Sequence, residues 1–253
     1  MSGSRTSNSK KKRLDQILVD RGLLESRSRA QAVIMAGLVY SDTKRLEKAG
    51  QRVAEDIAIE LKGQDHPWVS RGGLKLDHGL SCFAIDVEGR ICLDIGASTG
   101  GFSDVLLSRN AAKVYAVDVG HGQLAWKLRQ DERIMVMERT NARYLTAETV
   151  PEAIEFICCD ASFIGLQTVL PAAMELAVSG ASLIALIKPQ FEVGKAQVGK
   201  KGVVREAALH QEVCDRISAW LDSLPNWQVL GIEESPIIGP EGNKEFLIAA
   251  KRI

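Results

Sequence analysis

The feature that most constrains this chain is the stretch at residues 91–109, ICLDIGASTGGFSDVLLSR. A short apolar run leads into Asp94, three glycines follow closely, and an amphipathic run begins at Phe102. This order predicts a strand, a glycine turn and a helix, the unit from which parallel α/β sheets are built. Glycines at such a turn let the backbone approach a ligand at the carboxyl end of the strand, where doubly wound sheets have their binding crevice.

The spacing of these glycines indicates the kind of ligand. Gly96, Gly100 and Gly101 form G-x-x-x-G-G, which differs from the G-x-G-x-x-G of dinucleotide sites, and glycines alone are equally typical of any tight strand-to-helix turn. Asp118 adds a second signal, because it ends the next strand-like run and is placed to accept hydrogen bonds from both hydroxyls of a ribose. We therefore expect a nucleoside ligand without a pyrophosphate, and S-adenosylmethionine fits best.

Strand-like and helical runs alternate steadily after this turn. The expected strands are 91–95, 113–119, 133–139, 154–159, 181–188, 227–234 and 245–251. The expected helices are 102–109, 122–130, 164–178 and 205–222. This alternation predicts a Rossmann-like α/β domain with a seven-stranded, mostly parallel sheet, helices on both of its faces and an antiparallel hairpin at the sheet edge.

Composition excludes several classes of protein. The chain has 253 residues, 45% of them hydrophobic and 25% charged, and no apolar run approaches the ~20 residues that cross a bilayer. The N-terminus lacks the apolar segment of a secretory signal, so we expect a cytoplasmic protein. Five cysteines show no CxxC pairing, which predicts small buried hydrophobic residues and neither a disulfide nor a metal site.

Charge is distributed unevenly along the chain. Residues 1–71 hold 14 Lys and Arg against 9 Asp and Glu, whereas residues 72–253 hold 18 against 23. A basic module joined to an acidic body is typical of proteins that bind a polyanion, although a solvated charged surface explains the same numbers.

The basic module has its own pattern. Residues 1–12 are serine-rich and basic, and we expect a disordered tail. From Arg13, apolar residues recur at helical spacing on both sides of the Arg21-Gly22 turn, with Ala32, Val33 and Met35 in the second helix, and short strands follow as far as Leu61.

The run RLDQILVDRGLLESRSRAQAVIMAGLV resembles the S4 RNA-binding domain, a small α+β fold. The resemblance implies an RNA-facing surface formed by Arg13, Arg27, Arg29 and Lys44. Ser41-Asp42-Thr43 stands where that family often has an Asn-Gly turn. The expected domains are a tail at 1–12, an S4-like domain at 13–64, a linker at 65–73 and a catalytic domain at 74–253, with Gly72-Gly73 as a flexible joint.

Two charged residues close apolar strands at the predicted crevice. Asp160 ends IEFICCD and Lys188 ends SLIALIKP. A lysine after such a run requires a carboxylate partner or a function, because burial disfavours its charged form. Asp160 could equally cap the following helix, and Lys188 could extend from the strand end into solvent.

Residues 13–253 as a whole resemble the TlyA family of rRNA 2′-O-methyltransferases, which also carries the name hemolysin A. The matching stretches are WVSRGGLKL, LDIGASTGGFSDVLL, AVDVGHGQLAW, ERTNAR, IKPQFEVGKAQVGKKGVV and SPIIGPEGNKEF. The catalytic domain of that family is similar to the FtsJ ribose methyltransferases, whose site is a Lys-Asp-Lys-Glu tetrad. The resemblance implies that the tetrad here is Lys75, Asp160, Lys188 and Glu245.

The same resemblance implies the remaining site residues. S-adenosylmethionine would contact Gly96, Ser98, Gly100, Gly101 and Phe102 around its methionine, Asp118 at its ribose and Asn141 near its adenine. Arg71 and a basic loop that carries Lys195, Lys200 and Lys201 would contact RNA, although a solvated loop has the same composition.

We therefore expect S-adenosylmethionine-dependent 2′-O-methylation of a ribosomal RNA cytidine by a monomer without a metal, with the RNA gripped by the S4-like domain. One alternative is a membrane-acting cytolysin, for which the sequence offers neither a spanning segment nor a strongly apolar amphipathic stretch. The other is a catalytically silent RNA-binding protein, and the four filled tetrad positions argue against it.

Overall fold

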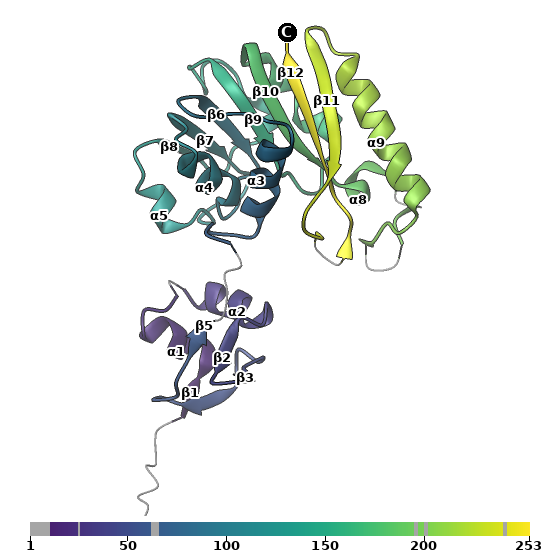
Figure 1. Ribbon diagram of the computed structural model, residues 1–253. Coiled ribbons are helices and arrows are strands. Elements are labelled where there is room, and N and C mark those ends of the chain that lie inside the picture. The colour runs from purple at the N-terminus through teal and green to yellow at the C-terminus, as the bar shows by residue number, and fades with distance from the viewer. Residues whose placement is uncertain (1–10, 25, 62–65, 195–196, 200–201, 240–241) are drawn as a thin grey trace, which may run out of the picture. The chain divides into compact units, whose positions relative to one another are not determined.

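A computed structural model of the protein describes residues 11–24, 26–61, 66–194, 197–199, 202–239 and 242–253 (Figure 1). Contacts within the chain divide it into two compact units, residues 1–67 and 68–253. Each unit has its own hydrophobic core, so each is described by itself.

The smaller unit combines two helices with short antiparallel strands. Its helices are α1 (Leu14–Asp20) and α2 (Arg27–Met35). Its strands are β1 (Lys11–Arg13), β2 (Val39–Ser41), β3 (Lys44–Arg45), β4 (Arg52–Ala54) and β5 (Glu60–Leu61). Strand β1 pairs with β4, and β2 lies between β3 and β5. Lys11 and Lys12 thus belong to a strand, although the tail was expected to extend to residue 12.

The face of α2 that packs into the core of this unit differs from the expectation. The second helix buries Ala30 and Ile34, which lie four residues apart on one face, and leaves Met35 78% exposed. The prediction that Ala32 and Met35 belong to the buried face is therefore wrong. Their positions lie round the helix from Ala30 and Ile34, and apolar character alone did not separate the two faces.

The larger unit contains the predicted sheet. Its strands are β6 (Ile91–Ile95), β7 (Lys113–Val117), β8 (Ile134–Met137), β9 (Ile154–Cys159), β10 (Ala177–Ile187), β11 (Trp227–Glu234) and β12 (Phe246–Arg252). The strand order is β11-β12-β10-β9-β6-β7-β8, and β12 runs antiparallel to both of its neighbours, whereas the other strand pairs are parallel. The seven-stranded, mostly parallel fold is confirmed. The last two strands form the predicted antiparallel hairpin at the sheet edge, with β11 outermost and β12 paired to β10.

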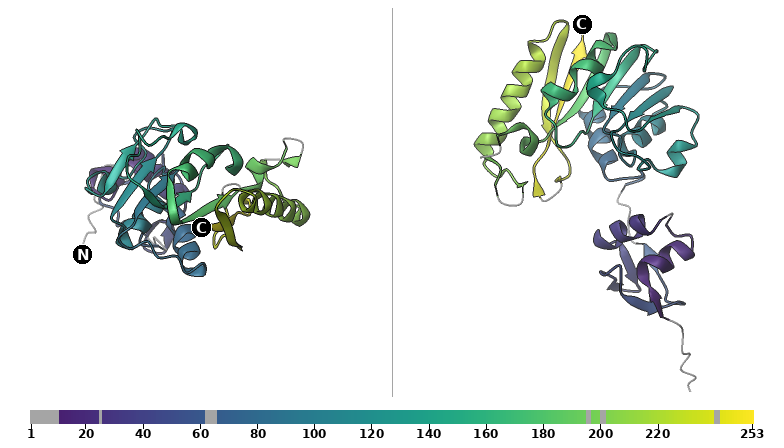
Figure 2. Two further views of the ribbon diagram at one scale, coloured as in Figure 1. Left: turned by 90° about the horizontal axis from the view of Figure 1, so that it is seen from above. Right: turned by 180° about the vertical axis from the view of Figure 1, so that it is seen from behind.

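Helices cover both faces of this sheet. They are α3 (Gly72–Cys82), α4 (Gly101–Ser108), α5 (Trp126–Arg129), α6 (Leu166–Val169), α7 (Pro171–Glu175), α8 (Pro189–Glu192) and α9 (Ala207–Asp222), with a 3-10 helix η1 at Ala142–Tyr144. Side chains of α3, α4 and α5 belong to one core cluster, whereas those of α6, α7 and α9 belong to the other. Helix α9 runs alongside β11 (Figure 2).

Two local expectations for this unit are wrong. Gly72 and Gly73 form the first turn of α3 and do not act as a loose joint, and Trp68 packs against the adjacent core cluster. The helix expected at 164–178 is two short helices, because Pro171 begins the second one and has no N–H to continue the first.

The cysteines are free thiols in this structure. Four are buried and Cys82 is exposed on α3, so the expectation of burial fails for Cys82. Burial raises the pKa of Cys159 to about 12, which keeps that thiol protonated. Among the described residues, no group of histidine, cysteine and acidic side chains could hold a metal ion, and no helix is long and apolar enough to cross a bilayer.

Candidate active site

The four tetrad positions meet at one end of the sheet because of its topology. Asp160 follows β9, Lys188 follows β10, and Glu245 precedes the antiparallel strand β12. The register that pairs Ile187 with Phe246 brings Lys188 and Glu245 to the same end of neighbouring strands. Lys75 reaches this end from the first turns of α3.

Ion pairs connect these side chains one after another, in the order Glu245, Lys75, Asp160 and Lys188. The Lys75 Nζ lies 2.6 Å from Glu245 Oε2 and 3.6 Å from Asp160 Oδ2. Asp160 Oδ1 forms an ion pair with Lys188. The side chains of Lys75 and Lys188 are 8% and 7% exposed, and that of Glu245 is fully buried. Two buried lysines are therefore balanced by two carboxylates, as burial of charge requires.

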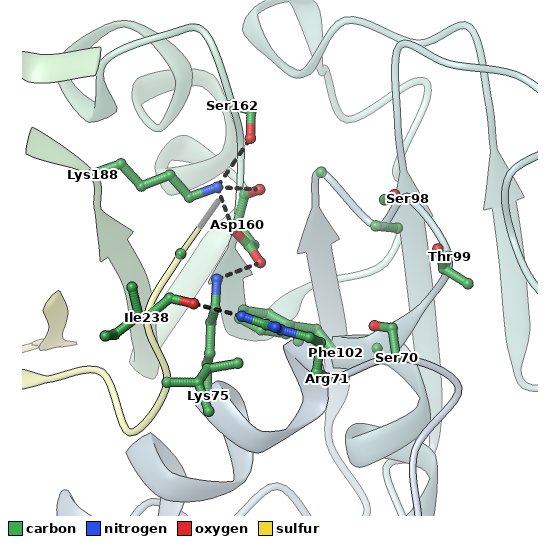
Figure 3. Close-up of a pocket in the computed structure, with 16 residues that line it drawn as sticks. Ser70, Arg71, Lys75, Ser98, Thr99, Phe102, Asp160, Ser162, Lys188 and Ile238 are labelled. Carbon is green, nitrogen blue, oxygen red and sulfur yellow. Dashed lines mark hydrogen bonds and ion pairs between the residues drawn. The ribbon is translucent and has the colours of Figure 1, made fainter. Parts of the chain in front are cut away.

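Lys188 is surrounded by oxygen atoms. Besides its ion pair with Asp160, its ammonium donates to the Asp160 carbonyl at 3.2 Å and to Ser162 Oγ at 3.1 Å. Figure 3 shows the ammonium between Ser162 and Asp160, with Lys75 reaching Asp160 from the other side. The ammonium is thus fixed at the wall of a cavity.

Two cavities adjoin the tetrad. One of about 540 Å³ is lined by Lys75, Asp160 and Lys188 together with Arg71 and Phe102. A second of about 430 Å³ extends past Asp118 and Asn141. Both cavities are lined by Gly96, Ser98, Asp160 and Ser162. They form one crevice at the carboxyl ends of β6 and β9, where the strand order reverses.

The glycine turn is shaped by its contacts. Gly96 has φ +79°, and a Cβ there would lie 3.0 Å from the backbone of Ala161. A Cβ at Gly101 would meet the Ser70 hydroxyl, and one at Gly100 would meet the side chain of Leu128. These positions admit glycine alone without rearrangement, so the turn passes close to both neighbouring chain segments.

Asp118 orders the same turn. Its Oδ2 accepts the Ser98 N–H at 2.8 Å and its Oδ1 accepts the Gly120 N–H at 2.6 Å. Each carboxylate oxygen has two lone pairs, so both retain capacity for a ligand hydroxyl. Asn141 caps η1 by accepting the Arg143 N–H at 3.1 Å, and its side chain lines the second cavity.

Several residues of the crevice were not predicted from the sequence. Gln123, Thr140 and Phe163 line the second cavity, and Ser70 and Ile238 line the first. Phe163 is 90% exposed and has φ +64°, a conformation that a non-glycine residue rarely adopts. An apolar residue after a strand is ordinary in the core, and no pattern in the sequence distinguishes Phe163 from one.

A buried carboxyl group lies beneath the turn. Asp94 is fully buried and its Oδ2 accepts the Ser103 hydroxyl at 2.6 Å. Burial raises the pKa of Asp94 to about 7, despite the hydrogen bond from Ser103. Asp94 therefore takes up its proton at a higher pH than an ordinary aspartate does.

The expected RNA-binding residues fall into three groups. Arg13 and Arg27 both pair with Asp15 in the smaller unit, at 2.8 and 3.1 Å, and Lys44 is exposed on β3. Arg29 follows Arg27 on α2. In the larger unit Arg71 donates to the Ile238 carbonyl at 2.6 Å and lines the first cavity. Lys195, Lys200 and Lys201 lie outside the residues that the structure describes.

Comparison with known proteins identifies both units. The sequence model of the FtsJ-like methyltransferases matches residues 68–252, and that of the S4 domain matches residues 12–56. The chain is 48% identical to "Putative rRNA methyltransferase YqxC" of Bacillus subtilis, over 95% of this chain and 85% of that protein. It is 46% identical to "16S/23S rRNA (cytidine-2'-O)-methyltransferase TlyA" of Mycobacterium tuberculosis, over 93% of this chain and 88% of that protein.

A solved structure agrees with this result. "Putative hemolysin from Streptococcus thermophilus" superposes with a TM-score of 0.75 at 43% identity, covering 96% of this chain and 88% of that one. The relatives therefore share both the S4 and the catalytic parts with this protein over nearly their whole length. The chain belongs to the FtsJ-like methyltransferases, in the TlyA family that joins this catalytic domain to an N-terminal S4 domain.

Proposed function

We propose that this protein transfers a methyl group from S-adenosylmethionine to the ribose 2′-hydroxyl of a cytidine in ribosomal RNA. The observation that carries the proposal is the chain of ion pairs Glu245–Lys75–Asp160–Lys188 at the wall of the crevice. Relatives at 46–48% identity are named as rRNA methyltransferases, and one of them as cytidine-2′-O-specific.

The crevice fits S-adenosylmethionine by its shape and by its donors and acceptors. The glycine turn packs closely against neighbouring segments, where a Cβ at Gly96 or Gly101 would collide with protein atoms, and its residues Gly96 and Ser98 line both cavities. The Asp118 carboxylate can hold the two ribose hydroxyls, and Asn141 lines the part beyond it, where the adenine would lie. Ser98, Gly100 and Phe102 would surround the methionine. The cofactor supplies a methyl group on a positively charged sulfur.

The tetrad supplies what a ribose hydroxyl lacks. A 2′-hydroxyl is a weak nucleophile, so the reaction requires alignment and stabilisation of the charge that develops on its oxygen as the proton leaves. Lys188 lines the first cavity and is the group that we assign to this oxygen. Asp160 holds Lys188 in place, Lys75 pairs with Asp160, and Glu245 holds Lys75.

The S4 domain and the lysine-rich loop would bind the RNA. Arg13, Arg27, Arg29 and Lys44 offer four positive side chains on the smaller unit, and Lys195, Lys200 and Lys201 follow the catalytic lysine in the sequence. Arg71 lines the cavity beside Lys75 and could contact the target nucleotide. Phosphate contacts of this kind position a nucleic acid without reading its sequence.

Methyl transfer to ribosomal RNA tests the proposal directly. Ribosomal subunits from cells that lack the protein would be incubated with the purified protein and S-adenosylmethionine, and the RNA would be digested and mapped by mass spectrometry. We expect one additional methyl on the ribose of a cytidine, and no product with Lys188→Ala. A methyl on a base, or no methyl with a protein that binds both ligands, would overturn the assignment.

A further inference from the structure

We infer that Ser162, which lines both cavities, is a positioning residue for Lys188 and fixes its ammonium at the wall of the first cavity. This inference rests on the proposed function, and it adds a group outside the Lys-Asp-Lys-Glu tetrad. The Ser162 hydroxyl accepts a hydrogen bond from Lys188 Nζ at 3.1 Å, and Ser162 lines both cavities.

The need for such a group follows from the other contacts of Lys188. Its remaining oxygen contacts are the side chain and the carbonyl of Asp160. Both belong to one residue, and Figure 3 shows them next to the Ser162 hydroxyl. A lysine has four rotatable side-chain bonds, and contacts to a single residue leave it more freedom to swing about them. The Ser162 hydroxyl adds a contact from a second residue and so restricts that movement.

The location of Ser162 fits a role in the reaction. The acceptor hydroxyl has to reach the methyl group from the tetrad cavity, so the ammonium that meets its oxygen has to lie at the border of the two cavities. Ser162 lines both cavities and contacts Lys188, whereas Lys75 pairs with Asp160 and Glu245 holds Lys75. Loss of its hydroxyl would let Lys188 move away from the cofactor cavity.

The backbone around Ser162 supports this assignment. The next residue, Phe163, has φ +64°, a conformation that residues other than glycine rarely adopt. Such conformations persist where the surroundings demand them, and they cluster at functional sites. The turn that directs the Ser162 hydroxyl toward Lys188 is therefore held against a local preference.

Steady-state kinetics of Ser162→Ala and Ser162→Thr test the inference. We expect Ser162→Ala to lower kcat about tenfold, the effect of losing one hydrogen bond to a charged group. The KM for RNA and the Kd for S-adenosylmethionine should stay within twofold of wild type, with an unchanged Tm. Ser162→Thr retains a hydroxyl and should keep at least half of the activity. Ser223→Ala removes an exposed hydroxyl that bonds the Trp220 carbonyl and serves as the matched control.

Two results would overturn the inference. One is equal kcat in wild type and Ser162→Ala, and the other is an equal loss in the alanine and threonine variants, because the hydroxyl would then be irrelevant. A crystal structure of Ser162→Ala gives a readout that needs no activity: we expect Lys188 Nζ to leave its position beside residue 162, and an unmoved Nζ contradicts the inference. If wild type transfers no methyl group, the proposed function fails, and the crystal structure still decides the role of Ser162.

Discussion

Two clusters of charged side chains in this protein each consist of a carboxylate and two basic residues, but the basic residues are exposed in one cluster and buried in the other. In the smaller unit, the fully buried Asp15 holds Arg13 and Arg27, whose side chains are 47% and 50% exposed. In the larger unit, Asp160 holds Lys75 and Lys188, whose side chains are 8% and 7% exposed. A carboxylate thus holds two half-exposed cations in one unit and two buried cations beside a crevice in the other.

The choice of cation matches the location. Arginine keeps its charge under all conditions and presents a planar fork that suits phosphate, whereas lysine is a compact point charge that can act on a single oxygen. Asp15 also accepts a hydrogen bond from Gln31 at 3.0 Å, and the bonds from Arg13 first and from Gln31 and Arg27 next lower its pKa well below the usual range. We call Lys75 and Lys188 the lysine cluster, and Arg13 and Arg27 the arginine cluster. The comparison predicts that substitutions in the lysine cluster abolish catalysis, whereas substitutions in the arginine cluster weaken RNA binding.

The largest effect is expected at Lys188. Lys188→Ala should lower the rate of methyl transfer by about 10²–10⁴-fold while RNA and cofactor still bind, because the lost interaction belongs to the transition state. Lys188→Arg should fail similarly, since a planar guanidinium does not fit the site of an ammonium. Single-turnover transfer at saturating ligands, with thermal melting of each variant, measures this. Substantial transfer by a folded alanine variant would remove Lys188 from the mechanism.

The next effect concerns the burial of the lysine cluster. Glu245→Gln leaves Lys75 buried with the more distant Asp160 as its carboxylate partner, and loss of one member of a buried pair costs about 3 kcal/mol or more. We expect the free energy of unfolding from guanidinium titration to fall by that amount. As a control, Glu234→Gln on β11 removes the exposed ion-pair partner of Lys244. This variant should change the free energy of unfolding by less than about 1 kcal/mol. Equal values for the two variants would show that burial does not distinguish the pairs.

Cofactor binding is expected to depend on Asp118. Asp118→Ala removes the acceptors for the ribose hydroxyls and also frees the N–H groups of Ser98 and Gly120, so S-adenosylmethionine affinity should fall by about 1.5–3 kcal/mol. Isothermal calorimetry measures the loss, with Asp215→Ala on α9 as a control. An unchanged Kd in a folded variant would place the nucleoside elsewhere.

The arginine cluster is tested by RNA binding. Replacing Arg27 and Arg29 with glutamine should weaken RNA affinity about tenfold and make its dependence on salt shallower by about one unit per lost phosphate contact, with cofactor affinity intact. Filter binding from low to high salt gives both quantities. The control variant is Lys113→Gln, which removes the ion-pair partner of Glu152 at the start of β7. It should alter neither the RNA affinity nor its dependence on salt. The same slope in the double variant and wild type would move the RNA footprint to other residues.

The smallest effect is expected at Asp15. A carboxylate whose pKa is lowered in the fold stabilises it above its unfolded pKa of about 3.9, and this contribution disappears as pH falls below that value. Asp15→Asn should therefore lose about 1 kcal/mol at pH 7 and show a flatter dependence of stability on pH in the acid range, since its arginine partners are half exposed. Amide hydrogen exchange in α1 reports on this unit. An acid response like that of wild type would show that another carboxylate is responsible.

The sequence predicted the sheet well because its signals are local. The alternation of strands and helices, the glycine turn and Asp118 follow from neighbours along the chain, and the structure has them in place. The edge hairpin was also predicted, but the order of the strands was not, because it depends on which distant strands pair with one another. The face of α2 was assigned wrongly because Met35 and Ile34 are both apolar and only packing separates them.

The site was predictable to a lesser degree from physics alone. Asp160 and Lys188 stand out as charges at strand ends, but Lys75 and Glu245 lie 170 positions apart and came only from the family resemblance. Neither Ser162 nor Phe163 carries a local signal, since a serine and a phenylalanine after a strand are ordinary. Their significance arises from a turn conformation that no pattern of polarity records.

The internal position of β12 has a consequence for how the protein acquires activity during synthesis. Strands β10 and β11 emerge from the ribosome before β12, yet they are separated in the sheet by β12 and do not pair with each other. Until residues 245–252 have been made, two apolar strands lack a neighbour and Lys75 lacks Glu245. Between the synthesis of β10 and that of β12 the facing edges of β10 and β11 stay unpaired, which is a state prone to aggregation, and the four-residue site is complete only once β12 enters the sheet.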